Sequence, residues 1–484
     1  MRWYNPIAGW VFLFLLSAVA GFSQPMDRPN MILIIADDVG WNDLGCYGNE
    51  AVSTPHMDRI AGEGIRFDNF FLTTSSCSPS RSSIISGRYP HNTGAPELHM
   101  PLPLEVAIFP ELLQTAGYFT GQAGKWHLGD AARKGFDVIY DKGKENGLGG
   151  EDKWIPLLQE RPRDKPFFMW FASYDAHRPW GENEFSGTAN PGEVSPPPFL
   201  ADAPATRKDL ADYYDEITRL DHFIGQVEKE LERQDVSENT VLIIMSDNGR
   251  PFPRSKTRMM DSGLKSPFIV KWPEGIKRPG QVCPGLVSAI DIAPGLLELG
   301  GVEPPTGFQG RSFIPLLNNP DQDFREYVFG EHNWHDQEAH ERMVRTRDFL
   351  YVHNSRPNGS NNGPADSNRS SSFGDLKDLR DSGKLSAAQA EVFMMPRPEE
   401  ELYDVRKDTW QLVNLASIPE YHSRLENLRQ ILSQWRDDTH DSTPDHLTGD
   451  WYDRETGEAL DVERVRGEMP GGAEAVRTTG KGPF

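Results

Sequence analysis

Three uninterrupted apolar stretches lie at residues 31–36, 166–172 and 241–245. A continuous apolar run of this length predicts a strand in a parallel sheet that is covered on both faces. Polar side chains follow each run: Asp37 and Asp38, Asp175 and His177, and Asp247 and Asn248. Because ligands bind at the carboxyl ends of strands in open α/β sheets, these side chains predict one shared site.

Helical periodicity occupies the stretches between these runs. Apolar residues repeat at alternating spacings of three and four from Leu210 to Leu231, which predicts an amphipathic helix. Thr54 and Pro55 suit the cap and the first position of a short helix. Further helix candidates are residues 109–116 and 290–299. Strand and helix therefore alternate, and the predicted fold class is α/β.

The composition changes after residue 355. The stretch from 355 to about 375 is rich in Gly, Asn and Ser, and we predict a linker or long loop over 356–395. A strand candidate at 401–404 and a helix candidate near 421–435 then indicate a smaller C-terminal subdomain at 396–484. The catalytic domain is predicted to cover 25–355.

The N-terminus has the layout of a cleaved secretory signal peptide over residues 1–24. Arg2 supplies a basic start, residues 10–16 are apolar, and Ala18 and Ala20 precede the expected cleavage site. The apolar run is too short for a stable membrane span, although a retained N-terminal anchor is the alternative. We therefore expect a secreted or periplasmic protein with no membrane span after cleavage.

Charge and cysteine content limit the possible partners and disulfide bonds of the chain. The 484 residues carry a net charge of −22, which argues against nucleic acid as a partner because phosphate binding needs a basic face. The chain has three cysteines, Cys46, Cys77 and Cys283, so at least one has no disulfide partner within it. If the substrate is anionic, positive charge has to be concentrated at the site.

The side chains after the first and third apolar runs form an all-oxygen set. Asp37, Asp38, Asp247 and Asn248 offer carboxylate and amide oxygens, which Ca²⁺ and Mg²⁺ prefer, whereas Zn²⁺ recruits His or Cys. Each pair on its own could equally begin a loop. Both pairs together, each following a buried strand, favour a metal site.

The motif Cys-Ser-Pro-Ser-Arg at 77–81 is the most unusual stretch of the chain. Small polar residues followed by an apolar stretch predict a loop that enters a helix, whose N-terminus favours anions. On its own, Cys77 could be an ordinary buried thiol or a nucleophile. The acidic set nearby in the predicted fold points to a different role.

Together these motifs resemble the type I, formylglycine-dependent sulfatases. Cys-x-Pro-Ser-Arg followed by Ser-Gly is the signature of that family, and it is accompanied by five further motifs in the family's order. They are Asp-Asp at 37–38, Gly-Lys-Trp-His-Leu-Gly at 124–129, His-Arg-Pro at 177–179, Asp-Asn-Gly at 247–249, and Lys256 ahead of Asp-Ser-Gly at 261–263. The resemblance spans most of residues 30–440. Stretches at 76–81, 205–211, 247–253 and 435–441 look like the heparan N-sulfatase (sulfamidase) branch, whose bacterial relatives act on other sulfated glycans.

The resemblance implies an alkaline-phosphatase-like fold, with a large, mixed but mostly parallel sheet between helices and a smaller C-terminal α+β subdomain. It implies that a separate formylglycine-generating or anaerobic sulfatase-maturing enzyme oxidises Cys77 to formylglycine (3-oxoalanine). One hydroxyl of the hydrated aldehyde attacks sulfur, and the other later expels sulfate. One Ca²⁺ per chain would be held by Asp37, Asp38, Asp247, Asn248 and the modified Cys77.

The resemblance also implies roles for the basic side chains. Arg81 and Lys125 would stabilise the alkoxide form of the nucleophile, and Lys256 would bind a sulfate oxygen. His127 would act as the base toward the second hydroxyl, and His177 as the acid toward the leaving oxygen or nitrogen. Outside that family's motifs, a lone Lys or His is more often a surface or structural residue.

Positive charge does recur at one place. A basic island of Arg250, Arg254, Lys256 and Arg258 follows the Asp247-Asn248 pair, and we expect it to attract a polyanionic substrate. An exposed charged loop is the simpler alternative. Candidates for substrate binding, all at polar positions, are Lys256, His177, Arg178, His99 and His335.

Three functions therefore compete. The first is a sulfatase acting on a sulfated poly- or oligosaccharide, as a sulfamidase on N-sulfated glucosamine or as an O-sulfatase of an algal glycan such as ulvan. The second is a phosphatase or phosphonate hydrolase of the same fold, which the absence of His from the predicted metal set disfavours. The third is an inactive glycan-binding relative, which the presence of Cys77, Lys125 and His127 disfavours. The scissile bond, the sugar and the mode of attack depend on loops, and the sequence leaves them open.

Overall fold

The structure, a computed structural model, describes Met1 and residues 28–484. The predicted signal peptide at 1–24 lies, apart from Met1, outside the described residues. Among the described helices, none is both long enough and apolar enough to cross a membrane.

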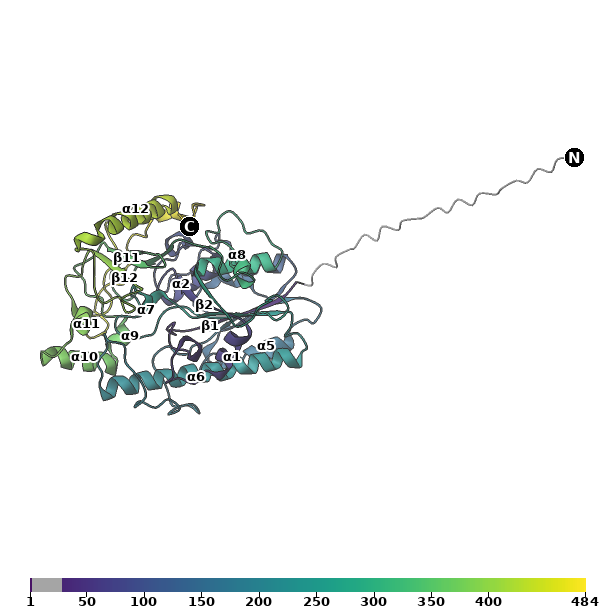
Figure 1. Cartoon of the computed structure of the whole chain (residues 1–484), viewed down its shortest axis with the longest axis horizontal. Coiled ribbons are helices and arrows are strands. Elements are labelled where there is room, and N and C mark those ends of the chain that lie inside the picture. The colour runs from purple at the N-terminus through teal and green to yellow at the C-terminus, as the bar shows by residue number, and fades with distance from the viewer. Residues whose placement is uncertain (2–27) are drawn as a thin grey trace.

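An eight-stranded sheet forms the centre of the molecule (Figure 1). Its strand order is β4-β3-β5-β1-β6-β7-β2-β8. The strands are β1 (Asn30–Ala36), β2 (Ile65–Phe71), β3 (Phe119–Gly124), β4 (Val138–Tyr140), β5 (Phe167–Ala172), β6 (Thr240–Ser246), β7 (Phe268–Lys271) and β8 (Gln281–Ser288). Only β7 among them runs antiparallel to its neighbours, so the prediction of a mixed, mostly parallel sheet is confirmed.

The three apolar runs of the sequence become the three central neighbours β5, β1 and β6. They pair in register, with Ile35 opposite Ala172 on one side and Ala36 opposite Ser246 on the other. The carboxyl ends of the three strands are therefore level. The residues that follow them emerge at one edge of the sheet.

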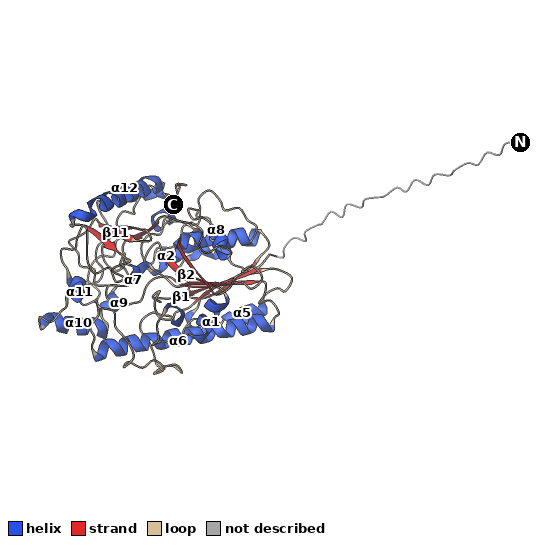
Figure 2. Cartoon of the chain, viewed as in Figure 1, coloured by secondary structure: helices blue, strands red, loops and turns tan. Residues whose placement is uncertain are grey.

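Helices cover both faces of the sheet, as Figure 2 shows. One layer contains α1 (Pro55–Glu63), α5 (Trp154–Glu160) and α6 (Pro204–Arg233), and the other contains α2 (Cys77–Ser86), α4 (Phe109–Thr115) and α8 (Ile292–Leu299). Alternate residues of β1 point into the two layers, with Met31, Leu33 and Ile35 in one core and Ile32 and Ile34 in the other. This two-sided burial explains why β1 is apolar from Met31 to Ala36.

The C-terminal region contains a second, four-stranded antiparallel sheet with the order β12-β11-β10-β9. Its strands are β9 (Val328–His332), β10 (Glu341–Arg345), β11 (Phe349–Asn354) and β12 (Glu400–Asp404), and α12 (His422–Thr439) packs on it through Leu425, Leu428 and Trp435. The predicted α+β character of this region is confirmed. However, three of its strands precede residue 355, so the sheet crosses the predicted domain boundary.

The predicted linker or long loop over 356–395 is wrong for much of its length. It contains α9 (Ala365–Asn368), α10 (Ser371–Asp381) and α11 (Ala387–Ala390), and α10 packs against α6. The side chain of Ser370 caps α10 by accepting a hydrogen bond from the backbone N–H of Phe373. Phe373 and Leu376 are buried. Two buried apolar residues and a cap are enough to hold α10 against α6, although most of the surrounding sequence is polar.

Candidate active site at the carboxyl edge of the main sheet

The ends of four neighbouring strands supply the polar side chains of this edge. Asp37 and Asp38 follow β1, Asp247 and Asn248 follow β6, Lys125 and His127 follow β3, and His177 lies five residues beyond β5. Asp37, Asp38, Asp247 and Asn248 are buried. Since the four strands are adjacent and parallel, residues separated by up to 211 positions in sequence share one site.

Helix α2 brings Cys77 to this edge. The helix begins at Cys77, whose Sγ lies 3.8 Å from Asp37 Oδ1 and 4.0 Å from Asp38 Oδ1. Arg81, one turn later on the same face, places Nε 2.8 Å from Asp247 Oδ2 and is completely buried. The prediction of a loop that enters a helix at Cys77 is confirmed.

The acidic side chains of this edge lie close enough together to bind one cation. One ligand atom from each of Asp37, Asp38, Cys77 and Asp247 lies within 4.8 Å of the others. The buried Asn248 Oδ1 has no hydrogen-bond partner within the described structure, and a buried acceptor without a partner is costly. An oxygen-rich cluster with one unsatisfied amide oxygen fits a hard cation such as Ca²⁺.

Two lysines contact this carboxylate cluster. Lys125 Nζ pairs with Asp37, and Lys256 Nζ lies 2.8 Å from both carboxylate oxygens of Asp38. Burial raises the pKa of Asp37, but Lys125, His177 and Arg81 outweigh burial and hold it below its ordinary value. The carboxylate of Asp37 is therefore charged at neutral pH.

Backbone geometry at the end of β3 aims Lys125 and His127 into the site. Gly124 has a φ of +97°, and a Cβ there would lie 1.8 Å from the carbonyl oxygen of Ala172, so only glycine fits. His127 itself has a φ of 52°, and its Nε2 lies 2.7 Å from Nδ1 of His99. Burial, Lys125 and His99 lower the pKa of His127 well below its ordinary value, which keeps the imidazole neutral.

His177 approaches from the segment after β5. Its Nδ1 faces the carbonyl oxygen of Arg178, which leaves Nε2 directed at two carboxylates. Nε2 lies 3.9 Å from Asp38 Oδ2 and 3.9 Å from Asp366 Oδ2. Asp366 belongs to α9, in the stretch predicted to be a loop, and no pattern around it indicated a functional role.

A cleft of about 520 Å³ opens onto these groups. Its walls include Asp37, Lys125, His127, Tyr174 and His177. A substrate group in this cleft can therefore reach the carboxylate cluster, both histidines and Lys125 together.

Two of the predicted substrate-binding residues have structural partners. Arg178 lines the cleft but binds Asp209 in a bidentate pair at 2.9 and 2.7 Å and stacks on Trp180. His335 is buried, with Nδ1 2.7 Å from the Ser76 hydroxyl, directly beside Cys77. Arg178 and His335 are therefore held by protein partners beside the site, whereas His99 contacts His127, which lines the cleft.

The basic island is neither an exposed loop nor a steering patch, and that expectation is wrong. Arg250, Arg254 and Arg258 are almost completely buried and pair with carboxylates: Arg250 with Asp43, and the other two with Glu391. Two carboxylates thus offset most of this charge within the fold, and the three guanidinium groups do not face solvent. Lys256 alone of the four reaches the site.

Comparison with known proteins agrees with this geometry. A sulfatase family model matches residues 29–149 and 150–302, and a model for the C-terminal part of N-sulphoglucosamine sulphohydrolase matches residues 254–358. The N-sulphoglucosamine sulphohydrolase of Homo sapiens is 33% identical over 476 residues, covering 88% of this chain and 93% of that protein.

Other relatives are more distant. An ulvan-active sulfatase of Formosa agariphila is 29% identical, covering 84% of this chain and 75% of that protein. A protein solved in complex with its substrate D-glucosamine-2-N,6-O-disulfate has the same fold, with a TM-score of 0.68 at 23% identity, over 85% of this chain and 98% of that one. The predicted family and fold are confirmed: the chain belongs to the sulfatase family and is a hydrolase of sulfate esters or sulfamates.

Proposed function

We propose that this chain is a calcium- and formylglycine-dependent sulfatase that removes sulfate groups from a sulfated poly- or oligosaccharide. The observation that carries the proposal is the position of Cys77, at the first residue of α2 and against the carboxylates of Asp37 and Asp38. No other described cysteine lies in a cluster of metal-ligand side chains.

Asp37, Asp38, Asp247 and Asn248 would hold the calcium ion, together with the modified side chain at position 77. The unsatisfied Oδ1 of Asn248 supports this assignment. When bound, the ion supplies Lewis acidity and a fixed point for a sulfate oxygen. The absence of His from this ligand set argues against the phosphatase and phosphonate hydrolase alternative.

The Cys77 side chain is poorly suited to act as a thiol. Burial raises its pKa to about 12, so the thiol is neutral at physiological pH and weakly nucleophilic. Conversion to formylglycine by a maturation enzyme would replace it with a hydrated aldehyde, which supplies a hydroxyl nucleophile. Arg81 and Lys125 would stabilise negative charge at this position. The Nη1 of Arg81 has no hydrogen-bond partner in the described structure, whereas its Nε and Nη2 pair with Asp247.

The two histidines divide the proton transfers between them. His127 is held neutral and lies in the cleft, which suits a base that removes a proton at position 77. His177 offers Nε2, since Nδ1 is committed to the carbonyl oxygen of Arg178, and this suits an acid that protonates the leaving atom. Lys256 would hold a sulfate oxygen, and Asp366 would orient His177.

The substrate class follows from relatives. The similarity to N-sulphoglucosamine sulphohydrolase covers most of both chains and includes its C-terminal family model, which supports N-sulfated glucosamine as the first candidate. The similarity to an ulvan-active sulfatase keeps an O-sulfated algal glycan as the second. The N-terminal pattern supports secretion or a periplasmic location.

The proposal is tested by sulfate release from a panel of substrates. The enzyme, co-expressed with a maturation enzyme that requires cysteine and supplied with Ca²⁺, is incubated with N-sulfated glucosamine and with O-sulfated animal and algal glycans. We expect release from at least one, and none from Cys77→Ser matured in the same way. Release from O-sulfated substrates alone would remove the sulfamidase assignment. Equal turnover by Cys77→Ser would contradict the proposed mechanism.

A further inference from the structure

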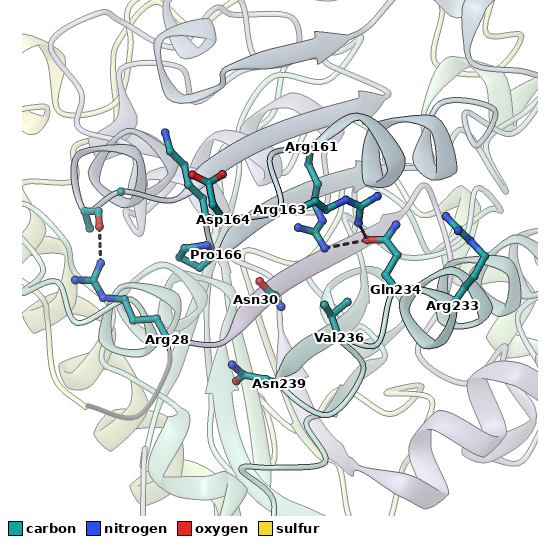
Figure 3. A pocket seen from close by; sticks show the side chains of 13 residues that line it. Arg28, Asn30, Arg161, Arg163, Asp164, Pro166, Arg233, Gln234, Val236 and Asn239 are labelled. Atoms are coloured by element: carbon teal, nitrogen blue, oxygen red, sulfur yellow. Dashed lines mark hydrogen bonds between the residues drawn. The ribbon is translucent and has the colours of Figure 1, made fainter. Parts of the chain in front are cut away.

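A second and larger cavity lies at the opposite, amino-terminal edge of the main sheet (Figure 3). It has a volume of about 800 Å³. Its walls include Asn30 at the start of β1, Pro166 just before β5, Val236 ahead of β6, and Gln234 just after α6. The seven residues of β1 separate it from Asp37, a distance of roughly 20 Å. The cavity is therefore distinct from the catalytic cleft.

Positive charge dominates this cavity, although the whole chain is acidic. Its lining includes five basic side chains and one acidic one: Arg28, Arg161, Arg163, Lys165 and Arg233, with Asp164. Arg233 binds Glu230 in a bidentate pair. Within residues 28–484, none of the other four lies within ion-pair distance of a carboxylate. The described residues thus place four cations around one cavity, with Asp164 as the one acidic side chain of its lining and no ion pair to any of the four.

Arg161 and Arg163 are the centre of this arrangement. Both donate to the same neutral acceptor, Oε1 of Gln234, and Figure 3 shows the two guanidinium groups turned toward it. Arg161 is only 5% exposed, and its Nε has no hydrogen-bond partner among the described residues. Burial and the neighbouring Arg163 lower the pKa of Arg161 to about 10, although Glu230 acts in the opposite direction. Two like charges held beside one amide oxygen are an unfavourable arrangement unless an anion joins them.

The cavity also holds Arg161 in place in advance. Its guanidinium lies 4.2 Å from the ring centre of Phe167, and its Nη1 donates to the carbonyl oxygen of Pro162 at 3.1 Å. A planar guanidinium fixed in this way binds tetrahedral oxyanions through paired N–H groups with little loss of side-chain freedom. Arg163 and Lys165 are exposed and can adjust to the rest of a ligand.

We propose that this cavity is a second, non-catalytic binding site for sulfate groups of a sulfated saccharide. The choice of a saccharide as the carrier rests on the proposed function, whereas the anion site rests on the cavity and its charges alone. The separation from the catalytic cleft means that a monosaccharide cannot occupy both places. The site would hold a distant part of a longer chain or another chain, and so keep the enzyme on a polymeric substrate.

The test uses the full chain with Cys77→Ala, which cannot turn over its ligand, in the presence of Ca²⁺. Calorimetric titrations are made with inorganic sulfate and with a heparin-type tetrasaccharide carrying N- and O-sulfate groups. They are repeated with Arg163→Gln/Lys165→Gln added, and with the charge-matched control Arg406→Gln/Lys407→Gln, whose residues are exposed on another part of the surface. We expect the cavity variant to lose one binding event, with affinity lowered at least about tenfold, and the control to keep it.

Equal stoichiometry and affinity in the cavity variant and the control would overturn the proposal. Binding of inorganic sulfate but not of the tetrasaccharide at this site would overturn the saccharide assignment. Sulfate release from a monosaccharide, measured in chains that retain Cys77, should be the same with and without the cavity substitutions. If no chain releases sulfate, the proposed function fails, while the titration with inorganic sulfate still reports on the cavity.

Discussion

Two buried clusters in this chain offer similar ligands, yet only one of them is built as a site. The catalytic cluster consists of Asp37, Asp38, Cys77 and Asp247, and the interior cluster consists of His91, Glu331 and Asp441, near the second sheet. In each cluster, one ligand atom from every member lies within 4.8 Å of the others. Ligand type and spacing alone therefore do not distinguish them.

The interior cluster is saturated by protein groups. Arg342 binds Asp441 in a bidentate pair at 2.8 and 2.7 Å and lies 3.5 Å from Glu331. His91 uses Nδ1 toward Glu331 at 3.0 Å and Nε2 toward the carbonyl oxygen of Thr439 at 3.2 Å. No buried polar side-chain atom of these four residues lacks a partner in the described structure. A guanidinium occupies the place that a cation would take.

The catalytic cluster is left incomplete by comparison. The buried atoms without partners in the described structure include Asn248 Oδ1, Nη1 of Arg81 and Nδ1 of His127. A cleft also connects this cluster to solvent. Unsatisfied groups facing an accessible space indicate a site that is completed by a ligand, whereas a closed network of pairs indicates a structural role.

We expect the largest effect on stability when Arg342 is removed from the interior cluster. Arg342→Met removes the cation and leaves two buried carboxylates without it, so the free energy of unfolding should fall by about 3–5 kcal/mol. Urea unfolding measures this, and kcat/KM of the folded fraction should change less than about twofold. A loss of activity without a loss of stability would assign a catalytic role to this cluster.

The stability lost in Arg342→Met should depend on pH. Burial raises the pKa of Asp441, but Arg342 and His91 outweigh it and hold the pKa below the ordinary 3.8. This carboxylate therefore contributes stability that is present above pH 3.8 and is lost as pH falls through the lower folded-state value. The stability difference between the parent and Arg342→Met should shrink between pH 7 and pH 3.

The next prediction compares the two clusters by replacing one asparagine beside each of them. Asn248→Ala removes a proposed calcium ligand that has no other Oδ1 partner, so activity should fall by about 10²–10³-fold with little change in stability. Asn333→Ala removes hydrogen bonds to Arg342 and Glu331 in the interior cluster. It should lower stability by about 1–3 kcal/mol and spare activity. Loss of stability in Asn248→Ala together with loss of activity in Asn333→Ala would contradict the roles assigned to the two clusters.

Removal of calcium should act on the catalytic cluster alone. A ligand present at a hundred times its Kd stabilises the folded state by about 2.7 kcal/mol, so chelation should lower Tm by a few degrees and abolish sulfate release. Readdition of Ca²⁺ should restore both. In Asn248→Ala the Tm shift should be smaller at the same concentration of calcium, which differential scanning calorimetry can measure.

The smallest expected effect concerns the pH profile of the base. Because burial, Lys125 and His99 lower the pKa of His127 well below 6.5, the acid-side fall in kcat/KM should lie below pH 6.5. His99→Gln removes one of these influences and should move that fall to higher pH. A fall centred at or above pH 6.5 in the parent, unchanged in the variant, would exclude His127 as the group responsible.

Much of the fold and site could be predicted because the signals are local. Each central strand is a continuous apolar run, and polar residues follow directly at its end, so the sequence alone places Asp37 and Asp247 together. The helix start at Cys77 is also a local pattern. These features need only neighbouring residues and the general rule of where α/β sheets bind ligands.

The rest depends on contacts between distant segments, which composition does not encode. Arg250, Arg254 and Arg258 look like a basic island until Asp43 and Glu391 are found beside them in the fold. Asp366 lies in a Gly- and Asn-rich stretch and approaches His177 from α9, just before α10, which packs on α6. The arginines of the second cavity likewise come together from three separate segments.

The chemical state of position 77 is measured most directly by the mass of the peptide that contains it, taken from enzyme that releases sulfate. Oxidation of the thiol to formylglycine lowers the mass by about 18 Da relative to cysteine. We expect this loss in the active preparation, with the fraction converted proportional to specific activity across preparations. A fully active enzyme whose peptide retains the unmodified cysteine mass would contradict it.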